Sequence, residues 1–245
     1  MNFEAPTKRK RPFERIDTWI FDLDNTLYPI SCNLFGQVEE RMETFIMAEL
    51  GVDRQTAHGM RRDFFATHGT TLRGLMNDHN VEPTRFLDYV HAIDLSGVPA
   101  DPALVAAINA LPGRKLVFTN SVSDYAERVM ERVGLTGHIE AVHDIIACGF
   151  EPKPNPGAYH TLLSRHAIDP RGAIFFEDMA KNLEPAAALG MTTAWVRSPM
   201  PWAQMGADAP YVHHVVEDLT HFLRDAVAPP APIDARRDVP HGAAS

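Results

Sequence analysis

Short apolar runs alternate with longer amphipathic segments over most of this chain. Each run is rich in β-branched or aromatic residues and is bounded by glycine, proline or polar residues, which is typical of buried strands. The segments between them repeat as helices do, and Gly134 and Gly190 follow two of them as stop signals. The alternation predicts an α/β fold, a Rossmann-like doubly wound parallel sheet with helices on both faces. The predicted strands are Thr18–Leu23, Lys115–Thr119, Asp144–Ala147, Ala173–Phe176 and Thr192–Val196, and the predicted helices are Asp124–Val133, Pro156–His166 and Asn182–Leu189.

One long segment interrupts this alternation. Between residues 30 and 111 the pattern is helical almost throughout, and Phe35, Val38, Met42 and Phe45 fall on one helical face. We therefore expect a helical subdomain, residues 30–111, inserted between the first and second strands of a core formed by residues 15–29 and 112–225. Residues 1–14, with a basic run, and 226–245, rich in proline and alanine, are predicted to be flexible tails.

The composition narrows the classes of partner. The chain has 245 residues, 23 Lys and Arg against 32 Asp and Glu, and a formal charge of −9, which does not favour binding to nucleic acid polymers or anionic membranes. Two cysteines cannot form a disulfide framework, and no Cys-x-x-Cys pair is present to hold zinc. The N-terminus does not resemble a signal peptide, and no apolar run is long enough to cross a membrane. We therefore expect a soluble cytoplasmic protein.

Polar residues follow the predicted strands, at the edge of a parallel sheet where ligands bind. Asp22, Asp24 and Thr26 come at the end of the first strand, and Thr119, Asn120 and Ser121 at the end of the second. Lys153 lies in a proline-rich loop beyond the third, and Glu177 and Asp178 end the fourth. These side chains are the candidate site residues.

The carboxylates among them predict a metal site. Asp22 and Asp24 are two positions apart, so they lie on the same side of an extended strand, and Asp178 adds negative charge to the same pocket. A hard divalent cation would offset the repulsion, and oxygen ligands suit Mg²⁺ better than zinc. The alternative is that these residues are ordinary helix caps and turn formers.

The remaining residues suit an anion. Thr119 and Asn120 offer a hydroxyl, an amide and backbone N–H groups where a helix begins, and Lys153 adds a positive charge. Each signal is weak alone, because an isolated lysine is more often a surface residue. Together they predict a phosphate-binding site.

With these residues in place, the chain resembles the haloacid dehalogenase-like superfamily. The segments FDLDNT, TNS, KPNP and FED match its four motifs in order, between Phe21 and Asn182. The resemblance implies that Asp22 is the nucleophile of a phosphoryl transfer and that Asp24 is the general acid and base. It also implies that Asp22, Asp24 (through its carbonyl), Asp178 and Glu177 hold or surround Mg²⁺, and that the helical insert is a cap. An acid at position 24 is typical of the phosphatases and phosphomutases of the superfamily rather than of its dehalogenases.

The closer resemblance is to pyrimidine 5′-nucleotidases. It rests on FDLDNTLYP, HGTTLRGLM, HAIDLS and FFEDMAKNL, of which the second and third lie in the insert. Two positions depart from the expected patterns: Ser121 stands where this subgroup often has glycine, and Asn182 stands where many superfamily members have aspartate. The resemblance implies a pyrimidine nucleoside 5′-monophosphate as substrate. Alternatives are a phosphatase of sugar phosphates or other small metabolites, a phosphomutase, and a non-catalytic scaffold.

Four residues of the insert are candidates for reading the rest of the substrate. His68, Thr70, Thr71 and Arg73 surround Gly69, where the backbone could bend. The alternative interpretation is that this segment is an ordinary junction between helices with a threonine N-cap.

Overall fold

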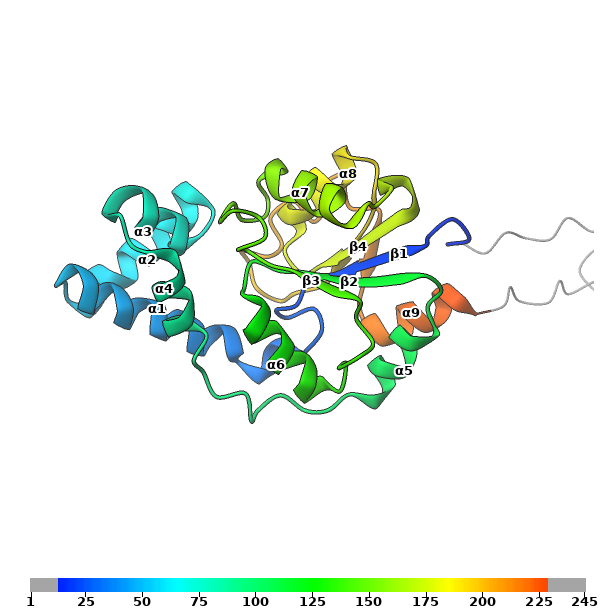
Figure 1. Cartoon of the computed structure of the whole chain (residues 1–245), viewed down its shortest axis with the longest axis horizontal. Helices are drawn as coiled ribbons and strands as arrows, with labels where there is room; N and C mark the ends of the chain where they lie inside the picture. The colour runs from blue at the N-terminus through cyan, green and yellow to red at the C-terminus, as the bar shows by residue number, and fades with distance from the viewer. Residues whose placement is uncertain (1–12, 229–245) are drawn as a thin grey trace, which may run out of the picture.

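The core is one parallel sheet of six strands, described here for residues 13–228 in a computed structural model. All neighbouring strands pair in parallel, in the order β3-β2-β1-β4-β5-β6 (Figure 1). The prediction of a doubly wound parallel α/β sheet is therefore confirmed. The strands are β1 (Thr18–Phe21), β2 (Arg114–Phe118), β3 (Ala141–His143), β4 (Ala173–Glu177), β5 (Thr192–Val196) and β6 (His214–Val216).

Side-chain alternation along the strands produces two apolar layers. In β1, Trp19 and Phe21 pack into one layer and Ile20 into the other, as the two-residue period of a strand requires. Helices α7 and α8 cover one face of the sheet, and α5, α6 and α9 lie against the other (Figure 1). These helices are α5 (Pro102–Ala110), α6 (Ser123–Val133), α7 (Pro156–His166), α8 (Leu183–Ala188) and α9 (Leu219–Val227), and short 3-10 turns span Ile30–Cys32, Pro170–Gly172 and Ala180–Asn182.

The segment between β1 and β2 is helical, as predicted. Its first four helices form a group beside the core (Figure 1), in which α1 packs against α2 and α4, and α2 packs against α3. The fifth, α5, instead packs against α9 beneath the sheet. Helix α5 therefore packs with the core, although the predicted helical insert extends to residue 111. The four helices are α1 (Leu34–Leu50), α2 (Arg54–His68), α3 (Thr71–His79) and α4 (Pro83–Val90).

The third strand differs from its prediction. Residues 141–143 form β3, and the predicted strand Asp144–Ala147 is wrong, since Asp144 has no regular secondary structure and residues 145–147 lie in turns. The carboxylate of Asp144 explains the difference, because it accepts hydrogen bonds from the backbone N–H groups of Ala147 and Ser123 at 2.8 and 3.0 Å. The apolar run after Asp144 is therefore bent into a turn, while Asp144 caps the start of α6. The edge strand β6 was not predicted, because three residues carry almost no periodic signal.

The ends of the described chain are packed against the core. Phe13 lies beside Trp19, with ring centroids 6.1 Å apart, and beside Phe222 of α9 at 5.6 Å. Helix α9 extends to Val227, one residue beyond Ala226, where the C-terminal tail was predicted to begin. The remainder of both predicted tails, residues 1–12 and 229–245, lies outside the described residues. Among residues 13–228, no helix is both long enough and apolar enough to cross a membrane.

Candidate active site

The turn after β1 places two aspartates at the centre of the sheet edge. The backbone N–H of Asp22 still pairs with Phe176 of β4, at 2.8 Å, so Asp22 is fixed by the sheet. The chain then turns, with Leu27 N–H bonded to the carbonyl of Leu23 and with Asn25 in the left-handed region at φ 60°. Asparagine adopts this conformation more readily than most residues, so the local sequence suits the turn.

Lys153 places a buried ammonium group among the carboxylates of the site. Its buried Nζ donates hydrogen bonds to Asp22 Oδ1 at 2.6 Å, to Glu177 Oε2 at 2.7 Å and to the carbonyl of Phe118 at 2.8 Å. The side chains of Lys153 and Glu177 are each 1% exposed, and that of Asp22 is 8% exposed. The structure therefore brings Asp22, Lys153 and Glu177, three of the candidate site residues, into direct contact.

Burial and like charges act on the protonation of these groups. Burial raises the pKa of Asp22 well above its ordinary value, and Glu177 adds to the rise, whereas Lys153 opposes it. Burial also raises the pKa of Asp178, with further contributions from Glu177 and Asp22. For Lys153, burial alone would lower the pKa, but Asp22 and Glu177 outweigh it and hold the pKa above its ordinary value. The lysine thus stays charged and offsets part of the negative charge.

The carboxylates of Asp22, Glu177 and Asp178 form a buried acidic cluster. One oxygen of each lies within 4.8 Å of the others. Both oxygens of Glu177 have protein partners, since Oε1 accepts from the N–H of Met179 at 3.1 Å and Oε2 from Lys153. Asp178 Oδ2 is buried and accepts no hydrogen bond from the described residues. An unpartnered buried carboxylate oxygen beside two more carboxylates fits a hard divalent cation.

Asp24 lies apart from that cluster and has different partners. Its Oδ1 accepts hydrogen bonds from the hydroxyls of Tyr28 at 2.6 Å and Tyr125 at 3.0 Å, and its Oδ2 accepts one from Ser121 at 2.8 Å. We call Ser121, Tyr28 and Tyr125 the hydroxyl cradle. Burial, and then the charge of Asp24, raise the pKa of both tyrosines. The tyrosines therefore remain protonated donors.

Sequence reasoning did not identify the two tyrosines of the cradle. Tyr28 lies four residues after Asp24, a spacing that could have suggested a contact through the turn. Tyr125 is 101 positions from Asp24, and nothing in its local sequence distinguishes it from a core residue of α6.

The predicted phosphate-binding residues are brought to the same edge. Thr119 is buried, and its hydroxyl accepts the N–H of Ser121 at 3.0 Å. The side-chain amide of Asn120 pairs with the backbone of Lys153 in both directions, donating to its carbonyl at 3.2 Å and accepting its N–H at 2.8 Å. Asn120 therefore fixes the loop that carries Lys153, a role distinct from the predicted side-chain contact with phosphate.

The four predicted cap residues lie at the junction of α2 and α3. The hydroxyl of Thr70 accepts the N–H of Arg73 at 3.2 Å as an N-cap, and Thr71 is buried. His68 contacts Asp78 at 3.2 Å. A Cβ on Gly69, which has φ 84°, would lie 3.9 Å from Pro152, the neighbour of Lys153. The junction thus has the geometry of an ordinary helix cap, and it also faces the loop that carries Lys153.

Comparison with known proteins identifies a relative, a family and structures with the same fold. The chain is 25% identical over 213 residues to the yeast (Saccharomyces cerevisiae) protein "Phosphate metabolism protein 8", a match that covers 78% of this chain and 65% of the relative. The chain thus spans about 65% of that relative's length.

Two solved structures show the same fold at low identity. A HAD phosphatase from Thermococcus onnurineus superposes with a TM-score of 0.60 at 13% identity, over 87% of this chain and 99% of that one. L-2-haloacid dehalogenase from Xanthobacter autotrophicus superposes with a TM-score of 0.54 at 19% identity, over 85% and 97% of the two chains. The family model described as haloacid dehalogenase-like hydrolase matches residues 16–190, which include every residue of the acidic cluster, and the chain therefore belongs to the haloacid dehalogenase-like hydrolase family.

Proposed function

We propose that this hydrolase is a Mg²⁺-dependent phosphomonoesterase that acts through an aspartyl-phosphate on Asp22. The observation that carries the proposal is the contrast between two aspartates in one turn. Asp22 is buried and bonded to an ammonium group, whereas Asp24 is bonded only to hydroxyls. A nucleophilic carboxylate and a separate proton donor are the two groups that a covalent phosphate-ester hydrolysis needs.

In the first half of the reaction, Asp22 forms a bond to phosphorus while the bond from phosphorus to the ester oxygen breaks. Asp24 gives a proton to the departing oxygen, so that an alcohol leaves instead of an alkoxide. In the second half, Asp24 takes a proton from water, which attacks phosphorus and releases phosphate from Asp22. Splitting the displacement in this way replaces one difficult step by two easier ones.

The acidic cluster fits the proposed cation. Asp22 and Asp178 would hold Mg²⁺ with their carboxylates and Asp24 with its backbone carbonyl, while Glu177, whose oxygens have protein partners, would orient Lys153. Bound there, the ion would offset the repulsion between a carboxylate nucleophile and an anionic phosphate. Lys153 and the Thr119 hydroxyl would hold the phosphoryl oxygens. Asn120 would fix the loop that carries Lys153.

For the substrate, we propose a pyrimidine nucleoside 5′-monophosphate. The support is the resemblance of two cap segments, around His68–Met76 and His91–Ser96, to pyrimidine 5′-nucleotidases. Gly69 of the α2–α3 junction faces Pro152, so closure of the cap would bring this junction, with His68, Thr70, Thr71 and Arg73, towards the nucleoside. Arg73 is bonded to Thr70 through its backbone N–H, so we propose its guanidinium as the group that contacts the nucleoside.

The experiment is release of free phosphate from a panel of phosphomonoesters, with and without Mg²⁺. The panel contains UMP, CMP, dUMP, dTMP, AMP, several sugar phosphates, phosphoglycolate and p-nitrophenyl phosphate. Metal-dependent release that is fastest from UMP and CMP supports the whole proposal. Faster release from a sugar phosphate keeps the chemistry and rejects the nucleotide, and no release from any ester by folded protein rejects the phosphatase.

A further inference from the structure

The hydroxyl cradle holds the carboxyl group of half-buried Asp24 by three side-chain hydrogen bonds. Three hydroxyl donors reach its two oxygens, from the end of the β1 turn, from the loop after β2 and from α6. None of the three donors carries a charge. A hydroxyl both donates and accepts hydrogen bonds, so the cradle can hold Asp24 whether or not its carboxyl group carries a proton.

Ser121 is itself held firmly in place. It is buried, its N–H donates to the hydroxyl of Thr119 at 3.0 Å, and its carbonyl accepts the N–H of Ile145 at 3.2 Å. With both backbone groups engaged, the remaining polar atom is its hydroxyl, which donates to Asp24 Oδ2. Ser121 therefore has a defined hydrogen-bond partner in this chain.

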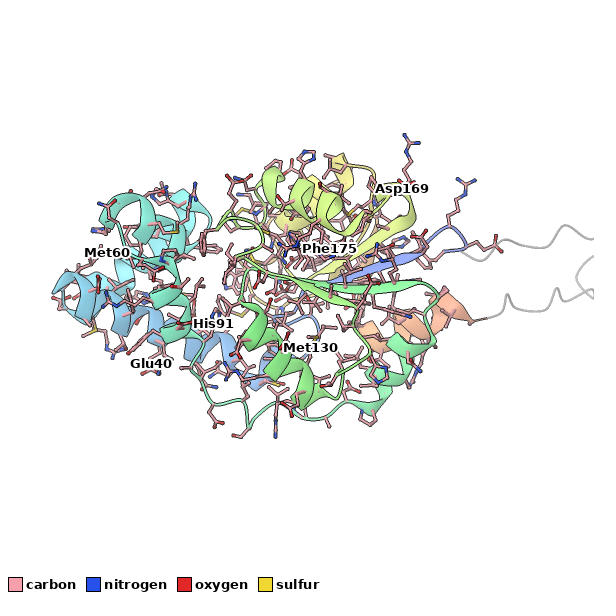
Figure 2. The ribbon with its side chains drawn as sticks, in the orientation of Figure 1. Glu40, Met60, His91, Met130, Asp169 and Phe175 are labelled. Carbon is pink, nitrogen blue, oxygen red and sulfur yellow. The ribbon has the colours of Figure 1, made fainter. Side chains whose placement is uncertain are left out.

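Tyr125 is fixed in a similar way. Its ring is 1% exposed and stacks on the imidazole of His91, with centroids 4.7 Å apart and planes 28° apart. His91 is the residue that follows α4 and is labelled in Figure 2, and Arg128 of α6 donates to its carbonyl at 2.9 Å. The tyrosine hydroxyl is thus presented to Asp24 by a rigid aromatic pair.

We propose that Ser121 and Tyr125 are positioning residues that hold the carboxyl group of Asp24 in the orientation from which it protonates the leaving oxygen. This inference rests on the proposed phosphomonoesterase function. In the step concerned, the bond between phosphorus and the ester oxygen breaks, its electron pair stays on that oxygen, and the proton of Asp24 moves to it. The hydroxyls donate to the carboxylate that remains, and they contact neither phosphate nor metal.

If Ser121 and Tyr125 only maintained the structure of the site, their loss would have a different effect on the rates. Esters with different leaving groups distinguish that role from positioning of Asp24. Protonation matters greatly when a basic alkoxide departs and little when p-nitrophenolate departs, because the latter is a weak base. A loss of positioning therefore slows alkyl esters selectively. A general loss of active-site order slows both kinds of ester alike.

The test compares kcat/KM of the wild type, Ser121→Ala and Tyr125→Phe on two substrates: p-nitrophenyl phosphate and the alkyl phosphate of the panel that the wild type hydrolyses fastest. The ratio kcat/KM reports the step in which the ester bond breaks. We expect each variant to lose about 30-fold or more on the alkyl ester and about 3-fold or less on the aryl ester, a fraction of the effect of a whole general acid. Ser121→Thr, which keeps the hydroxyl, should restore most of the alkyl activity.

A matched control is available at the start of α4. The hydroxyl of exposed Thr84 donates to Glu82 at 2.7 Å, so Thr84→Ala removes a bond from a hydroxyl to a carboxylate at a residue with no proposed role in the site and should change neither rate. Equal losses on both esters, or no loss on either, in folded Ser121→Ala and Tyr125→Phe overturn the inference. If one variant does not fold, the other decides. Failure of the proposed function is recognised separately, because the wild type itself then hydrolyses no ester.

Discussion

Replacing Asp178 by asparagine tests whether the acidic cluster is a metal site whose like charges destabilise the folded protein when no metal is bound. The three carboxylates lie within 4.8 Å of one another, and at an effective dielectric constant of about 20 each like-charge pair at that distance costs about 3.5 kcal/mol. Asp178 takes part in two such pairs, with Asp22 and with Glu177. Lys153 and partial protonation offset much of this, so we expect Asp178→Asn to raise the free energy of unfolding by about 1–3 kcal/mol without metal.

The pH dependence of this gain has a definite sign. The pKa of Asp178 is raised in the folded protein, so the folded state binds the proton more tightly than the unfolded state does. Its favourable contribution is therefore complete below the unfolded pKa, about 4, and is lost as the pH rises through the folded value. Asparagine does not titrate. The advantage of Asp178→Asn should be small at about pH 4 and should grow towards pH 8.

The assay is urea-induced unfolding in EDTA and in Mg²⁺ across this pH range. A metal at about 100 times its dissociation constant stabilises the folded state by about 2.7 kcal/mol, so the wild type should gain stability in Mg²⁺ and Asp178→Asn should gain little. Asp63→Asn, at an exposed aspartate of α2, is the control and should match the wild type throughout. The reasoning is refuted if Asp178→Asn is the less stable protein in EDTA at pH 8, or if Mg²⁺ stabilises it as it does the wild type.

Three further predictions concern other parts of the molecule. Asp22→Asn should abolish phosphate release and leave the far-UV circular dichroism unchanged; a folded variant that still turns over contradicts the covalent mechanism. Lys153→Met leaves Asp22 and Glu177 buried without their ammonium partner, so urea unfolding at neutral pH should show a loss of about 3–5 kcal/mol together with loss of activity; unchanged stability would show that Lys153 is not needed to offset the cluster. Gly74→Ala would place a Cβ against the ring of Phe64 between α3 and α2 and should cost about 1–3 kcal/mol in thermal unfolding, whereas Gly59→Ala, with open space around it, should not destabilise.

The sequence predicted the central strands well and the edge strands poorly. Strands β1, β2, β4 and β5 are central or next to the centre, buried on both faces, and therefore appear as continuous apolar runs. The edge strands β3 and β6 have three residues each and are only partly buried. The apolar run after β3 misled the assignment because Asp144 bends it into a turn through side-chain hydrogen bonds. Such bonds depend on where α6 begins, which periodicity does not indicate.

Charged site residues were predictable because topology alone brings them together. Asp22 and Lys153 are 131 positions apart, yet both follow strands of one parallel sheet, so their meeting needs no knowledge of side-chain direction. The contacts of Asn120 with the loop that carries Lys153 and of Tyr125 with Asp24 could not be predicted in this way, because they depend on side-chain direction. Asn120 lies just after a strand and Tyr125 in the first turn of a helix, and a single sequence does not specify the side-chain rotamers at these positions.

The environments of Asp22 and Asp24 differ in a way that suits the opposite roles proposed for them. The ammonium of Lys153 opposes the rise that burial causes in the pKa of Asp22 and so favours the anion, the form that would attack phosphorus in the proposed reaction. The partners of Asp24 are neutral hydroxyls, which suit a group that must release a proton in one half of the reaction and accept one in the other. Different environments for two like carboxyl groups are a general way of assigning acid and nucleophile roles. In this chain the difference arises from the loops after β2 and β3, since Ser121 is bonded to Asp24 and Lys153 to Asp22.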